Sequence, residues 1–242
     1  MGSKSRIAKF IVPIIQSHID SSHASEYIEP FVGGANVIDK IVCANKFGSD
    51  VNQELISLLE YAQAGNALPD TITRADYNDV REHQYAGKYP SWYVGCVGFL
   101  ASYNGRYFDG GYAQPGYEHS KSGSRYRDYY KEARNNLIKQ SESTLFKDIL
   151  FSCRDYCEWV NVKNSVVYLD PPYSGVKQFQ NSKSFSHTRF WEWAEEMSKN
   201  NIVLVSELAA PESWKCIWEK PVSRSIKSTD KTKAVEKLFV HN

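Results

Sequence analysis

An acid, two prolines and a tyrosine follow an apolar run in the segment "SVVYLDPPY", where they are Asp170, Pro171, Pro172 and Tyr173. The apolar run predicts a strand that delivers Asp170 to the carboxyl edge of a sheet, where open α/β folds hold their ligands. Because proline lacks an N–H group, the carbonyls of this turn keep a fixed direction and one stays available to a ligand. A carboxylate, a carbonyl and the flat face of Tyr173 would together hold a planar amine.

The same arrangement would also activate that amine. An exocyclic amino group is a poor nucleophile because its lone pair is delocalised into the ring. Hydrogen bonds from its two protons to two acceptors draw the nitrogen toward a tetrahedral, reactive form. The plainer interpretation is a tight proline turn with an acid at the strand end and a packed tyrosine. We favour the amine-binding interpretation because all four residue types stand in order at one strand end.

A glycine-rich turn in "EPFVGGAN" gives a second sign of a ligand site. Gly33 and Gly34 allow a sharp turn after a short strand and a close approach of the backbone to a ligand. Asp50 follows Gly33 by 17 residues, at the predicted end of the next strand, where a carboxylate can accept hydrogen bonds from both ribose hydroxyls. This spacing favours an adenosine-containing cofactor, and the lack of a G-x-G-x-x-G motif disfavours a dinucleotide. Alternatively, the turn only caps a helix, and Asp50 caps the helix in "VNQELISLL".

Hydrophobic spacing predicts the elements that position these residues. A helix over residues 7–15 opens the chain despite Pro13, and a strand, the glycine turn and a second helix occupy residues 26–42. The polar segment "NKFGSD" is interpreted as a turn that leads to a helix in "VNQELISLLEYAQ". The side chains expected to face the core in these three helices are Ile7, Phe10, Ile11, Ile14, Ile15, Val37, Ile38, Ile41, Val42, Leu55, Leu58 and Leu59.

Residues 65–147 differ from the rest of the chain. They are polar and crowded with tyrosine, glycine and arginine, and no strand–helix alternation can be read there. Alternation returns with strands in "SVVYL", "NIVLVSE" and "VEKLFV" and with a helix in "RFWEWAEEMSKN", whose Trp191 and Trp193 are expected to pack against the core. The sequence therefore predicts an α/β domain formed by residues 1–64 and 148–242, interrupted by an insertion at 65–147.

Composition narrows the class of protein. The 242 residues include 29 Lys and Arg against 28 Asp and Glu, so the net charge is +1 and any basic surface for nucleic acid must be local. The sequence shows no signal-like start and no run of about eighteen apolar residues. We expect a soluble, cytoplasmic protein without a membrane span. Its five cysteines are expected to be small buried hydrophobes in a reducing compartment rather than disulfides or a metal site.

The order of these motifs resembles that of the N6-adenine DNA methyltransferases of the DNA adenine methylase (Dam) family, alpha group. The matching segments are "GSK", "EPFVGGAN", "SDVNQEL", "YNGRYF", "FSCRDY", "VVYLDPPYSG", "FSHTRFWEWA" and "EKLFV". The resemblance implies a Rossmann-like sheet that binds S-adenosylmethionine, with an inserted, mostly helical target-recognition domain and hairpin loop at residues 65–147. It further implies a monomer that acts on double-stranded DNA without a metal, in a bacterial or phage-infected cell, with GATC as the family's usual target.

Matched positions imply roles for individual residues. Asp170, Pro171, Pro172 and Tyr173 would be catalytic. The residues so matched to S-adenosylmethionine are Lys4 at the methionine carboxylate, Phe31, Gly33 and Gly34 in the pocket, Asp50 at the ribose, Asp155 and Tyr156 beside the adenine, and Asp170. Lys4 and Asp155 would otherwise be solvated, and Phe31 would be a core residue.

The insertion would hold the DNA, because a methyltransferase must grip the duplex and extrude one base to reach its amine. Asn104 and Arg106, in "YNGRYF", resemble DNA-contacting positions of the family, and Arg106 could meet either a guanine edge or a phosphate. Lys121, Arg125 and Arg127 stand among tyrosines and suit phosphate contacts and stacking, although a solvated loop explains them as well.

The reaction implied is direct transfer of a methyl group from the sulfonium of S-adenosylmethionine to N6 of a flipped adenine, without a covalent enzyme intermediate. Positioning and charge stabilisation would supply the catalysis, with Asp170 first of all an acceptor. Three alternatives stay open: transfer to cytosine N4, transfer to a protein glutamine amide, and a catalytically silent DNA-binding partner. The glutamine enzymes typically carry Asn in place of Asp170, and a silent copy has no chemical reason to keep the whole motif.

Overall fold

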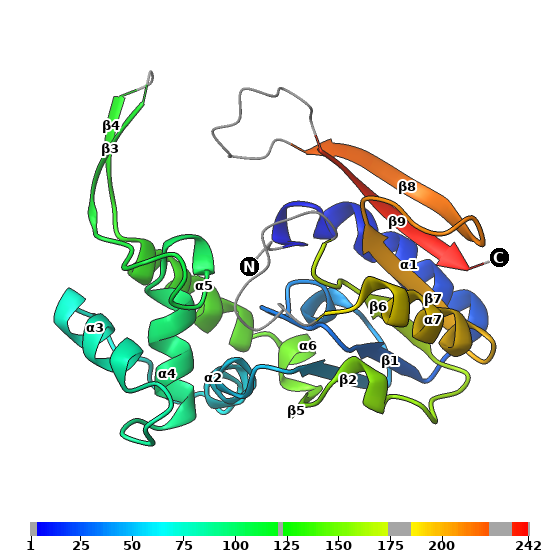
Figure 1. Cartoon of the computed structure of the whole chain (residues 1–242), viewed down its shortest axis with the longest axis horizontal. Helices are drawn as coiled ribbons and strands as arrows, with labels where there is room; N and C mark the ends of the chain where they lie inside the picture. The colour runs from blue at the N-terminus through cyan, green and yellow to red at the C-terminus, as the bar shows by residue number, and fades with distance from the viewer. Residues whose placement is uncertain (1–3, 121–122, 174–184, 223–233, 242) are drawn as a thin grey trace.

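The core of the protein is a seven-stranded sheet in the strand order β5-β2-β1-β6-β7-β9-β8 (Figure 1). The computed structural model describes residues 4–120, 123–173, 185–222 and 234–241. The strands of the sheet are β1 (Glu26–Glu29), β2 (Asn45–Asp50), β5 (Ile149–Cys153), β6 (Val166–Leu169), β7 (Ile202–Glu207), β8 (Trp214–Val222) and β9 (Ala234–His241).

Most neighbouring strands run parallel. β1 pairs in parallel with β2 and β6, β2 with β5, and β6 with β7, whereas β9 is antiparallel to both β7 and β8. The chain builds the sheet from β1 outward to β5 and then crosses to β6 on the other side of β1. The predicted α/β class is thereby confirmed, and the sheet is mostly parallel. The reversal lies between β1 and β6, a position where open α/β sheets form a ligand crevice.

Both faces of the sheet are covered, as the alternating burial of β6 shows. Val166 and Tyr168 belong to one buried cluster, and Val167 and Leu169 to another. The first cluster is closed by α1 (Ala8–Ser22) and α2 (Gln53–Gln63), and the second by α7 (His187–Ser198). Trp191 and Trp193 pack against the second cluster from α7, as expected.

The first helix is longer than its predicted span of residues 7–15. It continues through Pro13 to Ser22 and ends on His23, which takes a left-handed conformation (φ 54°). Pro13 lies on the exposed side, where its ring does not interrupt packing. The buried side of α1 consists of Ala8, Ile11, Ile15 and Ile19.

Two predicted elements are wrong. The helix expected after the glycine turn is a single 3-10 turn, Ile38–Lys40, and Val42 is 62% exposed. The polar segment "NKFGSD" is strand β2 rather than a turn, because its polar side chains find partners inside the protein: buried Lys46 donates to the carbonyl of Leu145, and the Ser49 hydroxyl accepts from Trp159 Nε1 at 2.9 Å.

Strand β8 was not anticipated at all. Its sequence, Trp214–Val222, contains charges and a proline, and it forms the outer edge of the sheet, where such residues are tolerated. The expected burial of the cysteines is also wrong for three of the five. Cys96 is buried and Cys43 partly so, but Cys153, Cys157 and Cys216 are exposed.

Between α2 and β5 the chain leaves the sheet and forms helices and a hairpin, at the left of Figure 1. The elements in chain order are α3 (Arg74–Glu82), α4 (Ser91–Gly95), a π-helix (Cys96–Leu100), a 3-10 turn (Tyr103–Gly105), the antiparallel pair β3 (Gly116–Ser120) and β4 (Gly123–Arg127), α5 (Tyr129–Ser141) and α6 (Thr144–Lys147). The limits predicted for the insertion, 65–147, remain a prediction. Across the described residues, no helix is both long and apolar enough to span a bilayer.

Candidate active site

Four adjacent parallel strands bring most of the predicted site residues to one edge of the sheet. Asp155 follows β5, Asp50 ends β2, the glycine turn follows β1, and Asp170 follows β6. Since parallel strands present their carboxyl ends at the same edge, these groups share one side of the fold. Phe31 and Asp170 follow β1 and β6, the two strands at which the strand order reverses.

Asp170 and Tyr173 lie in a network with Lys4 and an acid from the last strand. Lys4 Nζ is 2.7 Å from Asp170 Oδ1, donates to the Tyr173 hydroxyl and lies 4.4 Å from the centre of the Tyr173 ring. The Tyr173 hydroxyl donates to Glu236 Oε2 at 2.5 Å, and Lys4 Nζ is 3.6 Å from the same oxygen. The ammonium predicted to meet the cofactor's carboxylate therefore pairs with Asp170 in this structure.

Glu236 was not among the predicted site residues. It lies in β9 and belongs to the segment "EKLFV", which was noted only as a matching motif. A strand pattern alone could not indicate that this acid reaches Tyr173, because the contact depends on β9 inserting next to β7.

The electrostatics keep this cluster ready to accept and donate hydrogen bonds. Burial raises the pKa of Asp170, and the neighbouring Lys4 ammonium opposes that rise. Burial, with the nearby carboxylates of Asp170 and Glu236, raises the pKa of Tyr173 far above its ordinary value. Tyr173 thus stays a neutral phenol, and Asp170 depends on an adjacent cation to remain a carboxylate.

The glycine turn and Asp50 are joined by hydrogen bonds. Gly33 has φ 49°, a left-handed conformation that glycine adopts without strain, and its N–H donates to Asp50 Oδ2 at 3.3 Å. Asn52 N–H donates to Asp50 Oδ1 at 3.0 Å. Burial raises the pKa of Asp50 to about 6, against which these backbone donors act. With Val51 N–H as a third backbone donor, the carboxylate still has acceptor capacity for a ligand hydroxyl.

Asp50 does not cap helix α2, which was the alternative role considered for it. Asn52 caps α2 instead, with its side-chain oxygen accepting from Leu55 N–H at 2.7 Å. Asp50 is therefore bound to the glycine turn on one side and to the start of the helix on the other.

An aromatic cluster borders the same edge. Phe31 stacks on Tyr156 with ring centres 5.3 Å apart and planes inclined by 27°, and both rings meet Phe190 edge-on at 5.9 Å. Trp193 meets Tyr156 edge-on at 5.1 Å. Asp155 caps the 3-10 turn Tyr156–Glu158, with its carboxylate accepting from Cys157 N–H at 2.9 Å. Its side chain thus has a local structural role beside Tyr156.

The residues predicted to meet DNA fall into two neighbouring groups outside the sheet. Asn104, in a left-handed conformation (φ 56°), and Arg106 lie in the loop between the π-helix and β3. Tyr103 of this loop meets Tyr129 at the start of α5, with ring centres 5.8 Å apart, so the loop touches the base of the hairpin. Lys121 lies outside the described residues.

The two hairpin arginines differ in their surroundings. Arg127 donates from Nε to Glu132 Oε1 at 3.1 Å and from Nη1 to Glu118 Oε2 at 3.3 Å, and its Nη2 also donates to Glu132. Arg125 is 79% exposed, and its Nη2 comes no closer than 4.0 Å to Glu132 Oε1. Arg127 is therefore built into the base of the hairpin, whereas Arg125 presents its charge to solvent.

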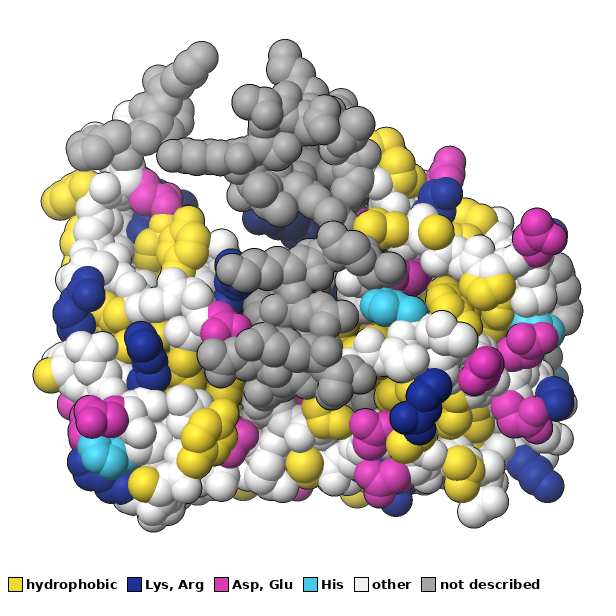
Figure 2. Space-filling model, in the orientation of Figure 1, with side chains coloured by type: hydrophobic (Ala, Val, Ile, Leu, Met, Phe, Trp, Pro, Cys, Tyr) yellow, Lys and Arg dark blue, Asp and Glu magenta, His cyan; other side chains and the backbone are white. Residues whose placement is uncertain are grey.

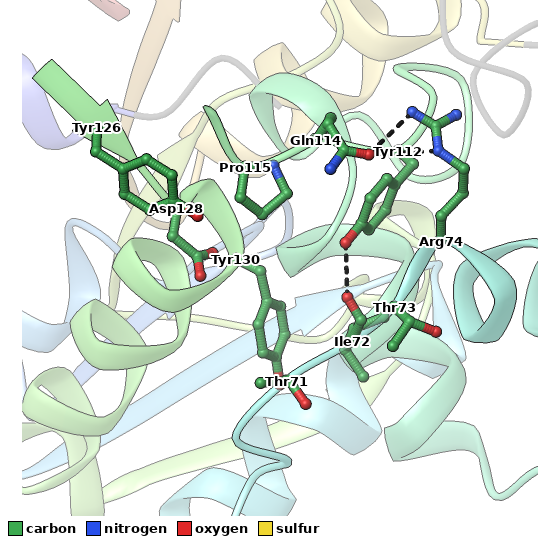
Figure 3. A pocket seen from close by; sticks show the side chains of 10 residues that line it. All are labelled: Thr71, Ile72, Thr73, Arg74, Tyr112, Gln114, Pro115, Tyr126, Asp128 and Tyr130. Carbon is green, nitrogen blue, oxygen red and sulfur yellow. Dashed lines mark hydrogen bonds between the residues drawn. The ribbon is translucent and has the colours of Figure 1, made fainter. Parts of the chain in front are cut away.

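A cavity of about 390 Å³ lies at the base of the hairpin rather than beside Asp170 (Figure 3). Arg74 Nη2 donates to Gln114 Oε1 at 3.1 Å across it, and the Tyr112 hydroxyl donates to the Ile72 carbonyl at 2.8 Å.

On the face shown in Figure 2, basic and acidic side chains are interspersed over the described surface, in line with the net charge of +1. Within the described ranges, no group of three or more His, Cys, Asp or Glu side chains could hold a metal ion.

Comparisons with known proteins show the family to which the chain belongs. Residues 1–90 and 107–206 match the family described as D12 class N6 adenine-specific DNA methyltransferase. The chain is 31% identical over 203 residues to DNA adenine methylases of Salmonella typhi and Salmonella typhimurium, covering 74% of this chain and 70% of each relative. The protein is therefore a methyltransferase. It belongs to the D12 class N6 adenine-specific DNA methyltransferase family, whose members depend on S-adenosylmethionine.

A solved structure aligns with nearly the whole chain at low sequence identity. The rRNA methyltransferase aviRa from Streptomyces viridochromogenes aligns with a TM-score of 0.44 and 10% sequence identity, covering 98% of this chain and 84% of that one.

Proposed function

We propose that this chain transfers a methyl group from S-adenosylmethionine to N6 of an adenine extruded from double-stranded DNA. The observation that carries the proposal is the position of Asp170 and Tyr173 directly after β6, next to β1 and its glycine turn. The sheet is then a Rossmann-like S-adenosylmethionine-binding fold, and residues 65–147 are its target-recognition insertion.

The residues at the sheet edge fit the cofactor. Asp50 has acceptor capacity left for a ribose hydroxyl, and Phe31 and Tyr156 offer flat apolar faces for an adenine. Lys4 would bind the methionine carboxylate, and Gly33 and Gly34 would leave room for the chain of the methionine. Bound there, S-adenosylmethionine supplies an electrophilic methyl group on its sulfonium.

Asp170 and Tyr173 would act on the amine. In this structure the Lys4 ammonium bonds to Asp170 and lies over the Tyr173 ring, so the site holds an N–H donor in the manner required of a target amine. Asp170 would accept one amine proton, a carbonyl of the Pro171–Pro172 turn would accept the other, and Tyr173 would face the adenine ring. The nitrogen lone pair is then directed at the methyl group.

The competition for Asp170 assigns two tasks to Lys4. While the amine site is empty, its charge balances the buried carboxylate of Asp170. When cofactor and adenine bind, the methionine carboxylate would attract the ammonium and free the Asp170 oxygen for the amine. Asp170 would serve as an acceptor while the methyl group arrives, since the amine becomes acidic only as it is methylated.

The helices and hairpin between α2 and β5 would bind the duplex. The loop that carries Asn104 and Arg106 contacts the hairpin base through Tyr103, and Arg125 of β4 is exposed to solvent, as a contact with DNA requires. We propose GATC as the first target sequence to test, because two relatives at 31% identity are DNA adenine methylases.

The test is methyl transfer from radiolabelled S-adenosylmethionine to unmethylated DNA, followed by digestion to nucleosides. Label in N6-methyladenine that disappears in Asp170→Ala supports the proposal, while label in N4-methylcytosine or in protein would replace it. Duplexes with one GATC site, compared with a permuted site of equal composition, test the target. Binding of cofactor and DNA without any transfer would indicate a silent partner.

A further inference from the structure

The glycine turn is held by a side chain from the insertion. Gln140, in the last turn of α5, donates from Nε2 to the carbonyls of Gly34 at 3.2 Å and Ala35 at 2.9 Å, and to Asp39 Oδ2 at 3.1 Å. An amide nitrogen carries two protons, and three acceptors at these distances engage both of them in hydrogen bonds. The only residues between this turn and β1 are Pro30, Phe31 and Val32, so the conformation of the turn affects how these three residues lie at the edge of the sheet.

The turn needs such an anchor because its backbone is strained. Ala35 has φ 54° although it carries a Cβ, a conformation that costs of the order of 1 kcal/mol or more and persists only when the surroundings impose it. Ala35 is fully buried, and its carbonyl is the one that Gln140 approaches most closely. The Gly34 carbonyl also accepts from Asn36 Nδ2 at 3.2 Å, a contact that lies within the turn itself.

The anchor comes from a helix that starts at the hairpin. Asp128, directly after β4, caps α5 by accepting from Lys131 N–H at 3.0 Å, and Gln140 lies near the other end of the same 13-residue helix. A helix of that length spans about 20 Å. One rigid element therefore connects the hairpin base, where Arg127 bonds to Glu132 of α5, with the glycine turn.

We propose that Gln140 is a positioning residue for cofactor binding: an amide from the target-recognition insertion sets the conformation of the Gly33–Asn36 turn. This inference rests on the proposed function, in which that turn faces S-adenosylmethionine. Gln140 touches neither cofactor nor adenine in this scheme and acts through the backbone of the turn.

The chain supplies a matched control in Gln63. Its Nε2, at the end of α2, also donates to three backbone carbonyls, those of Phe146 at 2.9 Å, Lys147 at 3.3 Å and Ile149 at 2.8 Å. Both glutamines are partly buried and both lie at a helix C-terminus. They differ in that the carbonyls bound by Gln63 belong to α6 and to the start of β5, whereas Gln140 binds the glycine turn itself.

The experiment compares wild type, Gln140→Ala, Gln140→Asn and Gln63→Ala in the full chain. S-adenosylmethionine affinity is measured by titration calorimetry, thermal stability by a melting curve, and KM and kcat by methyl transfer to DNA. We expect both alanine variants to lose similar stability. Gln140→Ala should bind the cofactor about tenfold more weakly and raise the KM for S-adenosylmethionine with kcat nearly unchanged. The cofactor affinity and KM of Gln63→Ala should stay within about twofold of wild type. Gln140→Asn keeps the amide on a shorter side chain and should weaken cofactor binding in the same way. It takes the place of Gln140→Ala if the alanine variant does not fold.

Equal cofactor affinity in the Gln140 and Gln63 variants, at similar losses of stability, would overturn the inference while leaving the proposed function intact. A wild-type chain that neither binds S-adenosylmethionine nor methylates DNA would overturn both. The wild-type titration therefore separates the two failures.

Discussion

Lys4 and Asp170 form a direct ion pair between the start of the chain and the end of β6, with Nζ 2.7 Å from Oδ1 and side chains 8% and 20% exposed. A buried carboxylate without a cation would favour its neutral form, and here the cation also donates to Tyr173. The pair links the predicted cofactor site to the predicted amine site, so changes at either residue should alter both.

Replacing Lys4 with Met removes the charge that opposes the effect of burial on Asp170. The pKa of Asp170 should then rise further, because burial and the nearby carboxylate of Glu236, which both raise it, are no longer opposed. The acid limb of the pH profile of kcat/KM should move to higher pH, and activity at neutral pH should fall by at least tenfold. Lys4→Arg keeps a cation and should leave the limb near its wild-type position. An unmoved limb in Lys4→Met would contradict this role.

Cofactor affinity should fall as the pH drops through about 6. Burial raises the pKa of Asp50 from its ordinary 3.8 to about 6, so the carboxylate that accepts the ribose hydroxyls is fully present only above that pH. Calorimetry should show a loss of up to about tenfold in affinity per pH unit below 6. Asp50→Asn should bind weakly at every pH, and a pH-dependent fall of equal size in that variant would trace the effect to another group.

The Tyr173 ring should matter more than its hydroxyl. Tyr173→Phe removes the hydrogen bonds with Lys4 and Glu236 but keeps the flat face, and we expect it to retain activity within about tenfold. Tyr173→Ala also removes the face, and base–aromatic stacking of about 1–3 kcal/mol predicts a further loss of about 5- to 150-fold. The rates of methyl transfer to a saturating DNA duplex measure both. Equal losses in the two variants would assign the role to the hydroxyl.

Arg125 and Arg127 should respond differently to salt. Arg125 is exposed, so Arg125→Ala should reduce the slope of log affinity against log salt concentration by about one if it meets a phosphate. Arg127 is bonded to Glu118 and Glu132, so Arg127→Ala should leave that slope unchanged and lower thermal stability instead. Fluorescence anisotropy with a labelled duplex at several salt concentrations measures the slopes. A reduced slope for Arg127→Ala alone would reverse the assignment.

Gly95 should not tolerate a side chain. A Cβ at this position would lie 2.1 Å from the Glu54 carbonyl oxygen, which is backbone of α2 and cannot move aside cheaply. Gly95→Ala should therefore cost about 1–3 kcal/mol of the free energy of unfolding. Gly116→Ala, whose Cβ would meet nothing within 4 Å, is the control in the same denaturant titration. Equal stability of the two variants would show that α2 and α4 can separate.

Local patterns were sufficient for the residues that lie at strand ends. Asp170 could be placed after a strand because four apolar residues precede it, and the glycine turn because it follows a short buried strand. The roles assigned to these residues remain predictions, since they depend on ligands. The family and the reaction class could be inferred because the motifs keep their order along the chain, and the comparisons confirm them.

Local sequence patterns could not predict the polar elements, because the residues that they contact are distant in the sequence. Lys46 is 1% exposed yet looks like a surface residue, since the carbonyl of Leu145 that it reaches is supplied by α6. Glu236 and Gln140 likewise acquire their contacts only when β9 and α5 are in place. A residue whose environment is made by long-range pairing carries no periodic signal of its own.

The pairing of β2 with β5 has a consequence for how the chain folds. Asp50 and Cys153 lie opposite each other in adjacent parallel strands, and the entire insertion is contained between them. Such non-local pairs form slowly, because closing a long loop costs entropy before any contact offsets it. During synthesis, the edge that carries Asp50 therefore stays incomplete until the insertion has left the ribosome and β5 can dock. An insertion that collapses early would bring these ends together and speed folding, so substitutions that loosen its helices should slow the maturation of the whole sheet.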